Sequence, residues 1–132
     1  MTRVRHRRRP EGTALPDYVI PLGRTIAIPM NGAMSRLAGP GFETVVRLRN
    51  ELRAGSFDVV HVHEPITALV GWDAACFDGA PVVGTFHAYS AKWLPNAIGS
   101  LFGARRVFNK LSARIAVSDA ARWTGERYFG GH

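Results

Sequence analysis

One short stretch, residues 57–65 (FDVVHVHEP), constrains the fold of this chain more than any other. Its first half is β-branched and aromatic, which is typical of a buried parallel strand. Its second half is polar and ends at Pro65, where a strand has to stop. Two imidazoles and a carboxylate at the exit of a core strand are unfavourable to bury unless they are paired or face a cleft. Since ligands of open α/β sheets bind outside the carboxyl ends of the strands, we expect a binding site around His63 and Glu64.

Predicted strands and helices alternate through the rest of the chain. Hydrophobic patterning predicts strands at 25–28, within 57–65, at 81–86 and at 114–117, the last three as core strands. It predicts helices at 42–53, at 67–77, within 91–111 and at 119–128. The connections are too long for hairpins, which indicates a parallel sheet with right-handed crossovers. We therefore predict an α/β fold, a Rossmann-like parallel sheet with flanking helices.

The positive charge is concentrated at the amino terminus. Five of the seven net charges come from one run: Arg3, Arg5, Arg7, Arg8 and Arg9. We interpret residues 1–14 as a basic flexible arm and residues 15–132 as a single domain. The arm is either a segment without a role or a site of attraction to anionic lipid or nucleic acid. Because the remainder is only mildly cationic, we do not expect nucleic acid as a partner of the domain.

Composition also bears on the cellular compartment. Cys76 is the only cysteine, so no intrachain disulfide forms and a reducing compartment is expected. No apolar run is long enough to span a bilayer. We therefore expect a cytoplasmic protein, with peripheral contact at the inner face of the membrane as the alternative.

A second predicted strand is also followed directly by a polar residue, which supports the candidate site. His87 follows the strand predicted at 81–86, as His63 follows the central one, so both should open on the same edge of the sheet. A histidine there can hydrogen-bond a sugar or polyol hydroxyl, or transfer a proton. His61 lies further inside its strand, and we interpret it as a near-core histidine whose hydrogen bonds are satisfied.

Two further groups of residues have both a functional and an ordinary explanation. In the loop predicted at 31–36, Asn31 and Arg36 suit hydroxyls and a phosphate, but Asn-Gly is also a common turn pair. Basic residues near two aromatic rings suit a membrane surface, but they also suit a solvated helix face. This second group comprises Lys92, Trp93, Phe102, Arg105, Arg106 and Lys110. The sequence has no P-loop and no metal-ligand spacing, so we expect no metal.

Three segments occur in an order found in a known family. These are DVVHVHEP at 58–65, GTFH at 84–87 and RIAVS at 114–118. They resemble the acceptor-side, amino-terminal domain of the GT-B retaining glycosyltransferases of family 4. With LPDYV at 15–19, IPMNG at 28–32 and then Arg36, the chain is most similar to the phosphatidylinositol mannosyltransferases of that family.

The resemblance implies roles for several residues. His87 would be catalytic, near the point of sugar transfer, and Asn31 and Arg36 would lie at the polar head of the acceptor. Lys92 would face the same pocket, so the acceptor-binding set is Asn31, Arg36, His63, Glu64 and Lys92. The reaction would need no metal or cofactor. It would move mannose from GDP-mannose to a lipid or polyol acceptor.

Two parts of the family pattern are missing from this sequence. The basic arm stands where relatives have a strand and a glycine-rich loop, and the sequence stops before a donor-binding domain. We therefore expect a truncated domain that is inactive alone and needs a donor-domain chain for activity. The alternatives are a family 4 domain with another donor and acceptor, or a non-catalytic binding module whose arm holds anionic lipid or nucleic acid.

Overall fold

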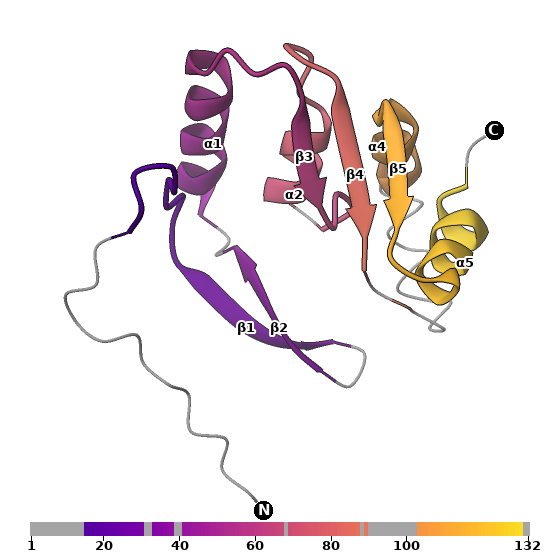
Figure 1. Ribbon diagram of the computed structural model, residues 1–132. Helices are drawn as coiled ribbons and strands as arrows, with labels where there is room; N and C mark the ends of the chain where they lie inside the picture. Colours follow the sequence, from indigo (N-terminus) through magenta and orange to yellow (C-terminus); the bar gives the residue numbers. More distant parts are fainter. Residues whose placement is uncertain are drawn as a thin grey trace, which may run out of the picture.

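The computed structural model describes residues 15–30, 33–38, 41–67, 69–87, 89 and 103–130. The basic arm at 1–14 lies outside these residues and remains a prediction. The described strands and helices follow one another in the order β1 (Thr25–Met30), β2 (Ala33–Ala38), α1 (Phe42–Ala54), β3 (Val60–His63), α2 (Val70–Ala75), β4 (Val82–Phe86), α4 (Arg105–Lys110), β5 (Ala113–Ala116) and α5 (Asp119–Tyr128). They form two separate sheets (Figure 1).

The larger sheet is parallel and has the strand order β3-β4-β5. Its three arrows lie side by side and point the same way (Figure 1). The register pairs His63 with Thr85 and Thr85 with Ile115, so the carboxyl ends of the strands lie at one edge. The predicted α/β class and parallel sheet are confirmed.

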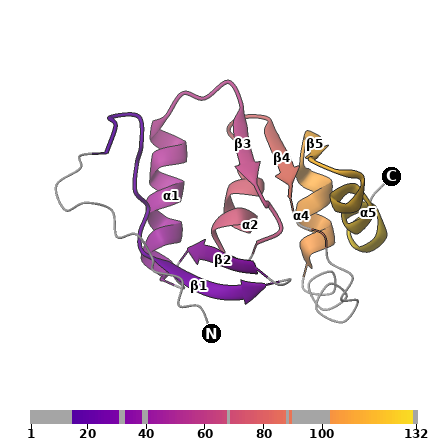
Figure 2. The same cartoon turned by 60° about the horizontal axis from the view of Figure 1, so that its bottom comes forward.

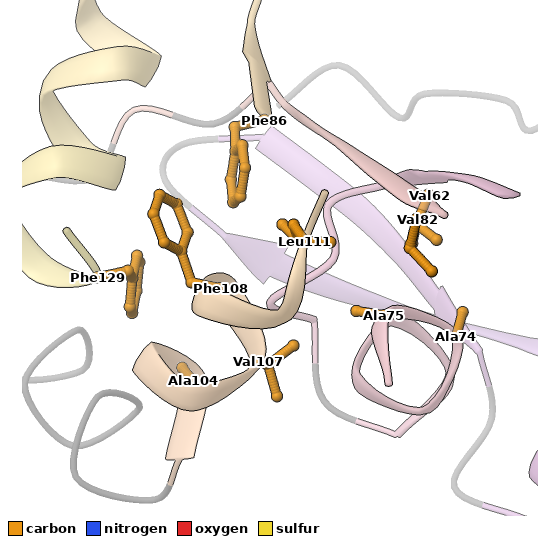
Figure 3. Close-up of a cluster of buried hydrophobic side chains, with 10 residues drawn as sticks. All are labelled: Val62, Ala74, Ala75, Val82, Phe86, Ala104, Val107, Phe108, Leu111 and Phe129. Atoms are coloured by element: carbon orange, nitrogen blue, oxygen red, sulfur yellow. The ribbon is translucent and has the colours of Figure 1, made fainter. Parts of the chain in front are cut away.

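The hydrophobic core lies between one face of this sheet and the helices. Aromatic rings at its centre belong to Phe86 on β4, Phe108 on α4 and Phe129 after α5 (Figure 3). Phe108 lies between the other two, with ring centroids 5.2 Å from Phe86 and 6.4 Å from Phe129. The remaining buried members are Val62, Ala74, Ala75, Val82, Ala104, Val107 and Leu111.

Two of the strands are less buried than we predicted. Val62 is the only buried residue of β3, whereas Phe57 and Val59, which we predicted as part of a buried strand, are exposed. All four residues of β5 are exposed, although we predicted a core strand there. The error arises because β5 is the last strand in the sheet order, so its apolar side chains have a neighbouring strand on one side only.

The smaller sheet is an antiparallel hairpin of β1 and β2, which corrects the predicted loop at 31–36. Arg36 lies within β2, opposite Ala27, and Pro29 does not end β1. In a two-stranded sheet every strand is an edge strand, where a proline is tolerated. Our inference that all connections are too long for hairpins is therefore wrong here. The register pairs Met30 with Ala33 across the two residues between the strands.

The helices agree better with the sequence pattern. α1 and α5 occupy the predicted ranges, and Ser118 caps α5 by accepting a hydrogen bond from the Ala121 amide at 3.2 Å. α2 is shorter than predicted, because the chain turns before it begins. Leu69, directly before α2, has a φ of 69°, outside the right-handed helical region.

Candidate functional site

The exits of β3 and β4 bring two histidines into contact. Nδ1 of His63 lies 2.7 Å from Nε2 of His87, within hydrogen-bonding distance. The rings stack with centroids 5.0 Å apart and 27° between their planes. Both side chains are exposed at the carboxyl edge of the parallel sheet. The expectation that the two residues open on the same edge is confirmed.

Glu64 connects the same two strand exits through its side chain and its backbone. Its Oε1 accepts a hydrogen bond from the backbone N–H of His87 at 2.6 Å. Its own N–H donates to the carbonyl of Thr85 at 2.8 Å, which extends the strand ladder by one residue. Glu64 therefore holds the end of β4 at two points, Thr85 and His87.

The backbone around Glu64 is set by a tight turn. Glu64 has a φ of 53°, in the left-handed region that non-glycine residues seldom occupy. Its carbonyl accepts from the Thr67 N–H at 2.9 Å, and Pro65 is fully buried. Gly71 of α2 packs against this turn, since a Cβ there would lie 2.9 Å from the Glu64 carbonyl oxygen. Helix α2 thus supports the turn that presents the Glu64 carboxylate.

The contact between the two imidazoles restricts their protonation. A hydrogen bond between two ring nitrogens needs a proton on one and a lone pair on the other. Either His63 donates from Nδ1, or His87 donates from Nε2. The contact cannot hold when both facing nitrogens are protonated. In the neutral pair, the other nitrogen of each ring is then an N–H donor or a lone-pair acceptor according to the tautomer, which suits a group that contacts a hydroxyl.

His61 lies on the same face of the sheet as His63. Its Nε2 lies 2.6 Å from the hydroxyl oxygen of Thr85, and its ring centroid is 4.6 Å from that of His63. The prediction of a satisfied histidine is confirmed, but the near-core position is wrong because the side chain is exposed. Side chains alternate along a strand, so the burial of Val62 on one face directs His61 and His63 to the other.

The other predicted acceptor-binding residues are not assembled by the described part of the chain. Arg36 lies on β2, whereas Asn31 and Lys92 lie outside the described residues. The hairpin lies toward the end of the molecule to which the parallel strands point, in both views (Figures 1 and 2). The backbone of β2 is thus at the same end as His63 and His87.

The basic group predicted near the membrane is described only in part. Arg105, Arg106 and Lys110 are exposed on α4 and line a shallow hollow. Lys92, Trp93 and Phe102 lie outside the described residues. Among the helices that the structure describes, none has the length and apolar character needed to cross a bilayer. In the same described ranges, no three His, Cys, Asp or Glu side chains are grouped to hold a metal.

Sequence reasoning missed the contacts that connect the site residues. The direct His63–His87 contact and the bond from the His87 amide to Glu64 require the pairing of β3 with β4. The one signal available was the position of polar residues directly after two predicted strands. That signal places residues at one edge but does not distinguish ligand contacts from contacts among the residues themselves.

Comparison with known proteins gives consistent matches. The family model described as Glycosyltransferase Family 4 matches residues 5–132. The phosphatidyl-myo-inositol mannosyltransferase of Mycobacterium tuberculosis (strain ATCC 25618 / H37Rv) is 40% identical over 112 residues, which are 83% of this chain and 28% of the relative.

Two further relatives carry the same name. The protein of Mycobacterium leprae (strain TN) is 41% identical over 112 residues, 83% of this chain and 29% of the relative. The protein of Propionibacterium freudenreichii subsp. shermanii is 30% identical over 119 residues, 88% of this chain and 30% of the relative. This chain therefore spans less than a third of the length of these relatives.

Proposed function

Because this chain belongs to glycosyltransferase family 4, we propose that it forms the acceptor-side part of a transferase that moves a sugar onto the inositol of a phosphatidylinositol-type lipid. The named relatives that it resembles at 30–41% identity are phosphatidyl-myo-inositol mannosyltransferases. Mannose is accordingly the sugar we propose, with GDP-mannose as its donor and without a metal or other cofactor.

The contact of His63, Glu64 and His87 at the carboxyl edge of the sheet is the observation that supports this proposal. Ligands of parallel α/β sheets bind at this edge. An imidazole held there by a second imidazole can donate to or accept from a sugar hydroxyl. We propose that His87 contacts the acceptor near the reacting hydroxyl, and that His63 and Glu64 belong to the same site.

The acceptor phosphate needs a cationic partner. Arg36 lies on the hairpin at the same end of the molecule, and a guanidinium suits a phosphate because its donors form a planar fork. We propose Arg36 for the phosphate, with Asn31 and Lys92 as further contacts to the polar head. The basic side chains of α4 are the proposed peripheral contact with a membrane surface.

We propose a division of labour for the reaction itself. The acceptor side positions the attacking hydroxyl, and a donor domain holds the nucleotide sugar and stabilises charge on its leaving phosphate. This chain corresponds to 28% of the Mycobacterium tuberculosis relative's length. We therefore expect the 132-residue chain to bind the acceptor head group but to transfer no mannose without a donor-domain chain.

Binding of inositol 1-phosphate to the ¹⁵N-labelled chain, followed by NMR, tests the proposal. We expect saturable shifts at His63 and His87, and binding at least about tenfold weaker in Arg36→Gln because a charge-assisted bond is lost. Glycerol 3-phosphate and inorganic phosphate serve as control ligands. Equal affinity for all three, or shifts confined to α4, would contradict an inositol site. Mannose transfer from GDP-mannose by the chain alone would refute the expected inactivity.

A further inference from the structure

We propose that His63 and Glu64 act as positioning residues for His87, and that neither binds the acceptor directly. This inference rests on the proposed function only in taking His87 as the acceptor contact. It refines the expectation that all three residues touch the acceptor. It also assigns Nδ1 of His87 as the nitrogen that faces the acceptor hydroxyl.

Glu64 fixes the backbone of His87. The last ladder hydrogen bond of the β3–β4 pair is the one from the Glu64 N–H to the Thr85 carbonyl, at 2.8 Å. His87 lies beyond β4, and the Glu64 carboxylate, rather than another backbone carbonyl, accepts from its N–H at 2.6 Å. A hydrogen bond to an ionised acceptor is shorter and stronger than a neutral one. The carboxylate thus holds the backbone of His87 in place just beyond the end of the β3–β4 pairing.

The left-handed backbone conformation of Glu64 also helps to position His87. A glutamate in the left-handed region is unfavourable and persists only where the surroundings hold it there. Here the supports are the buried ring of Pro65, the bond from the Thr67 N–H, and the close approach of Gly71. Such strain is typical of functional positions. In this site the left-handed turn directs the Glu64 carboxylate at the His87 N–H.

His63 fixes the ring of His87. Its Nδ1 engages Nε2 of His87 at 2.7 Å, and the two rings stack. Among the described residues, Nδ1 is then the His87 ring nitrogen that makes no hydrogen bond. Consider a neutral His87. If His63 donates to its Nε2, its Nδ1 carries the proton and donates to the acceptor molecule. If His87 donates from Nε2, its Nδ1 has a lone pair and accepts. His63 therefore decides which role His87 plays.

Imidazole NMR of the ligand-free chain tests the inference separately from the proposed function. ¹⁵N shifts of the His87 ring report its tautomer, and the amide proton shift of His87 reports its hydrogen bond. We expect His63→Phe, which keeps an aromatic ring, to change the tautomer populations of His87. The matched control is His61→Phe, on the same strand face, whose imidazole contacts Thr85 and the ring of His63 but not His87. This control should leave the tautomer populations of His87 unchanged.

The carboxylate is tested by two substitutions of graded severity. We expect Glu64→Gln, which keeps an acceptor oxygen, to move the His87 amide proton upfield, and Glu64→Ala to move it further. The control is Glu126→Gln, which removes an exposed carboxylate on α5 whose partner is Arg122. A well-dispersed amide spectrum establishes folding, and Glu64→Gln suffices if Glu64→Ala unfolds.

Inositol 1-phosphate binding completes the test. We expect about tenfold weaker binding in His63→Phe and Glu64→Ala, because a displaced His87 loses its alignment. Weaker binding with unchanged His87 signals would overturn the inference, because the two residues would then be direct ligands. Unchanged His87 signals with unchanged binding would overturn it as well. If the wild-type chain binds no inositol phosphate, the proposed function fails, while the ligand-free spectra still decide whether His63 and Glu64 position His87.

Discussion

Arg49 on α1 and Asp73 on α2, 24 residues apart in the sequence, form a two-pronged ion pair that joins the two helices. Nε of Arg49 donates to both carboxylate oxygens, at 2.8 and 3.0 Å, and a terminal guanidinium nitrogen donates to Oδ1 as well. The Asp73 side chain is only 14% exposed. Its hydrogen bond and charge raise the pKa of Arg49 above the ordinary value for an arginine.

The ion pair should contribute to stability in a salt-dependent way. We expect Arg49→Gln to lower the melting temperature in low salt and to have less effect in high salt, because salt screens an exposed pair. The control is Arg122→Gln, which removes an exposed pair within one helix and should have a smaller effect. Thermal unfolding followed by circular dichroism measures both. Equal effects of the two variants would show that the link between helices contributes nothing extra.

The contribution of the Arg49–Asp73 pair to stability should not change in mild alkali. A raised arginine pKa means that its contribution is fully present below the unfolded-state value and is lost as the pH rises through the folded-state value. Both values lie far above neutrality. We therefore expect the stability difference between wild type and Arg49→Gln to stay constant from neutral to mildly alkaline pH. Urea unfolding at several pH values measures it, and a decline that begins between neutral and mildly alkaline pH would contradict this expectation.

Loss of the central core ring should be severe. Phe108 is 6% exposed and lies between Phe86 and Phe129, and the Arg114 guanidinium carbon sits 4.5 Å from its ring centroid. We expect Phe108→Ala to lower the free energy of unfolding by about 3–5 kcal/mol. Urea unfolding measures it. Phe42→Ala, at a ring that is 77% exposed, is the control and should change stability by less than about 0.5 kcal/mol.

Two glycines should respond oppositely to alanine. At Gly84 a Cβ would lie 2.6 Å from a Leu111 methyl and 2.9 Å from the Pro65 ring, so Gly84→Ala should destabilise by about 1–3 kcal/mol. At Gly125, inside α5, a Cβ would meet Phe108 at an ordinary 3.6 Å. We expect Gly125→Ala to stabilise by up to about 1 kcal/mol, because alanine favours helix. Denaturant midpoints that shift in the same direction would contradict this reading of the packing.

The amino-terminal cap of α5 should be replaceable by another capping residue. Ser118 accepts from the Ala121 amide, so we expect Ser118→Ala to lower the free energy of unfolding by about 1 kcal/mol. Ser118→Asp keeps a cap acceptor and adds charge near the positive end of the helix dipole, so it should retain the stability of the wild type. Thermal melts of the two variants measure the cap. Equal losses would show that the serine contributes by something other than capping.

The elements that the sequence predicted well carry strong local signals. The apolar run of β4 and the periodicity of α1 and α5 identify those elements without knowledge of their neighbours. The hairpin was missed because residues 33–38 have a weak β pattern, and their strand conformation depends on pairing with β1. The exposure of β5 was missed because an apolar strand has the same sequence pattern at the centre and at the edge of a sheet.

The position of the candidate site could be predicted from the sequence, but the contacts among its residues could not. Polar residues after two parallel strands were enough to place His63 and His87 at one edge. The bond from the His87 amide to Glu64 depends on side-chain direction, on the left-handed backbone of Glu64 and on the support of Gly71. The Arg49–Asp73 pair was missed for a similar reason, since it depends on how two helices pack.

The separation of the chain into two sheets implies unequal resistance to opening. The β1–β2 hairpin shares no strand pairing with the β3–β4–β5 sheet, and its ladder closes over a short stretch of chain. Val62 and Val82 of the parallel sheet belong to the core, whereas Thr25, Ile26 and Ala27 of β1 are exposed. Hairpin amides should therefore exchange with deuterium through local opening, while the amides of β4 should exchange only when the whole domain unfolds.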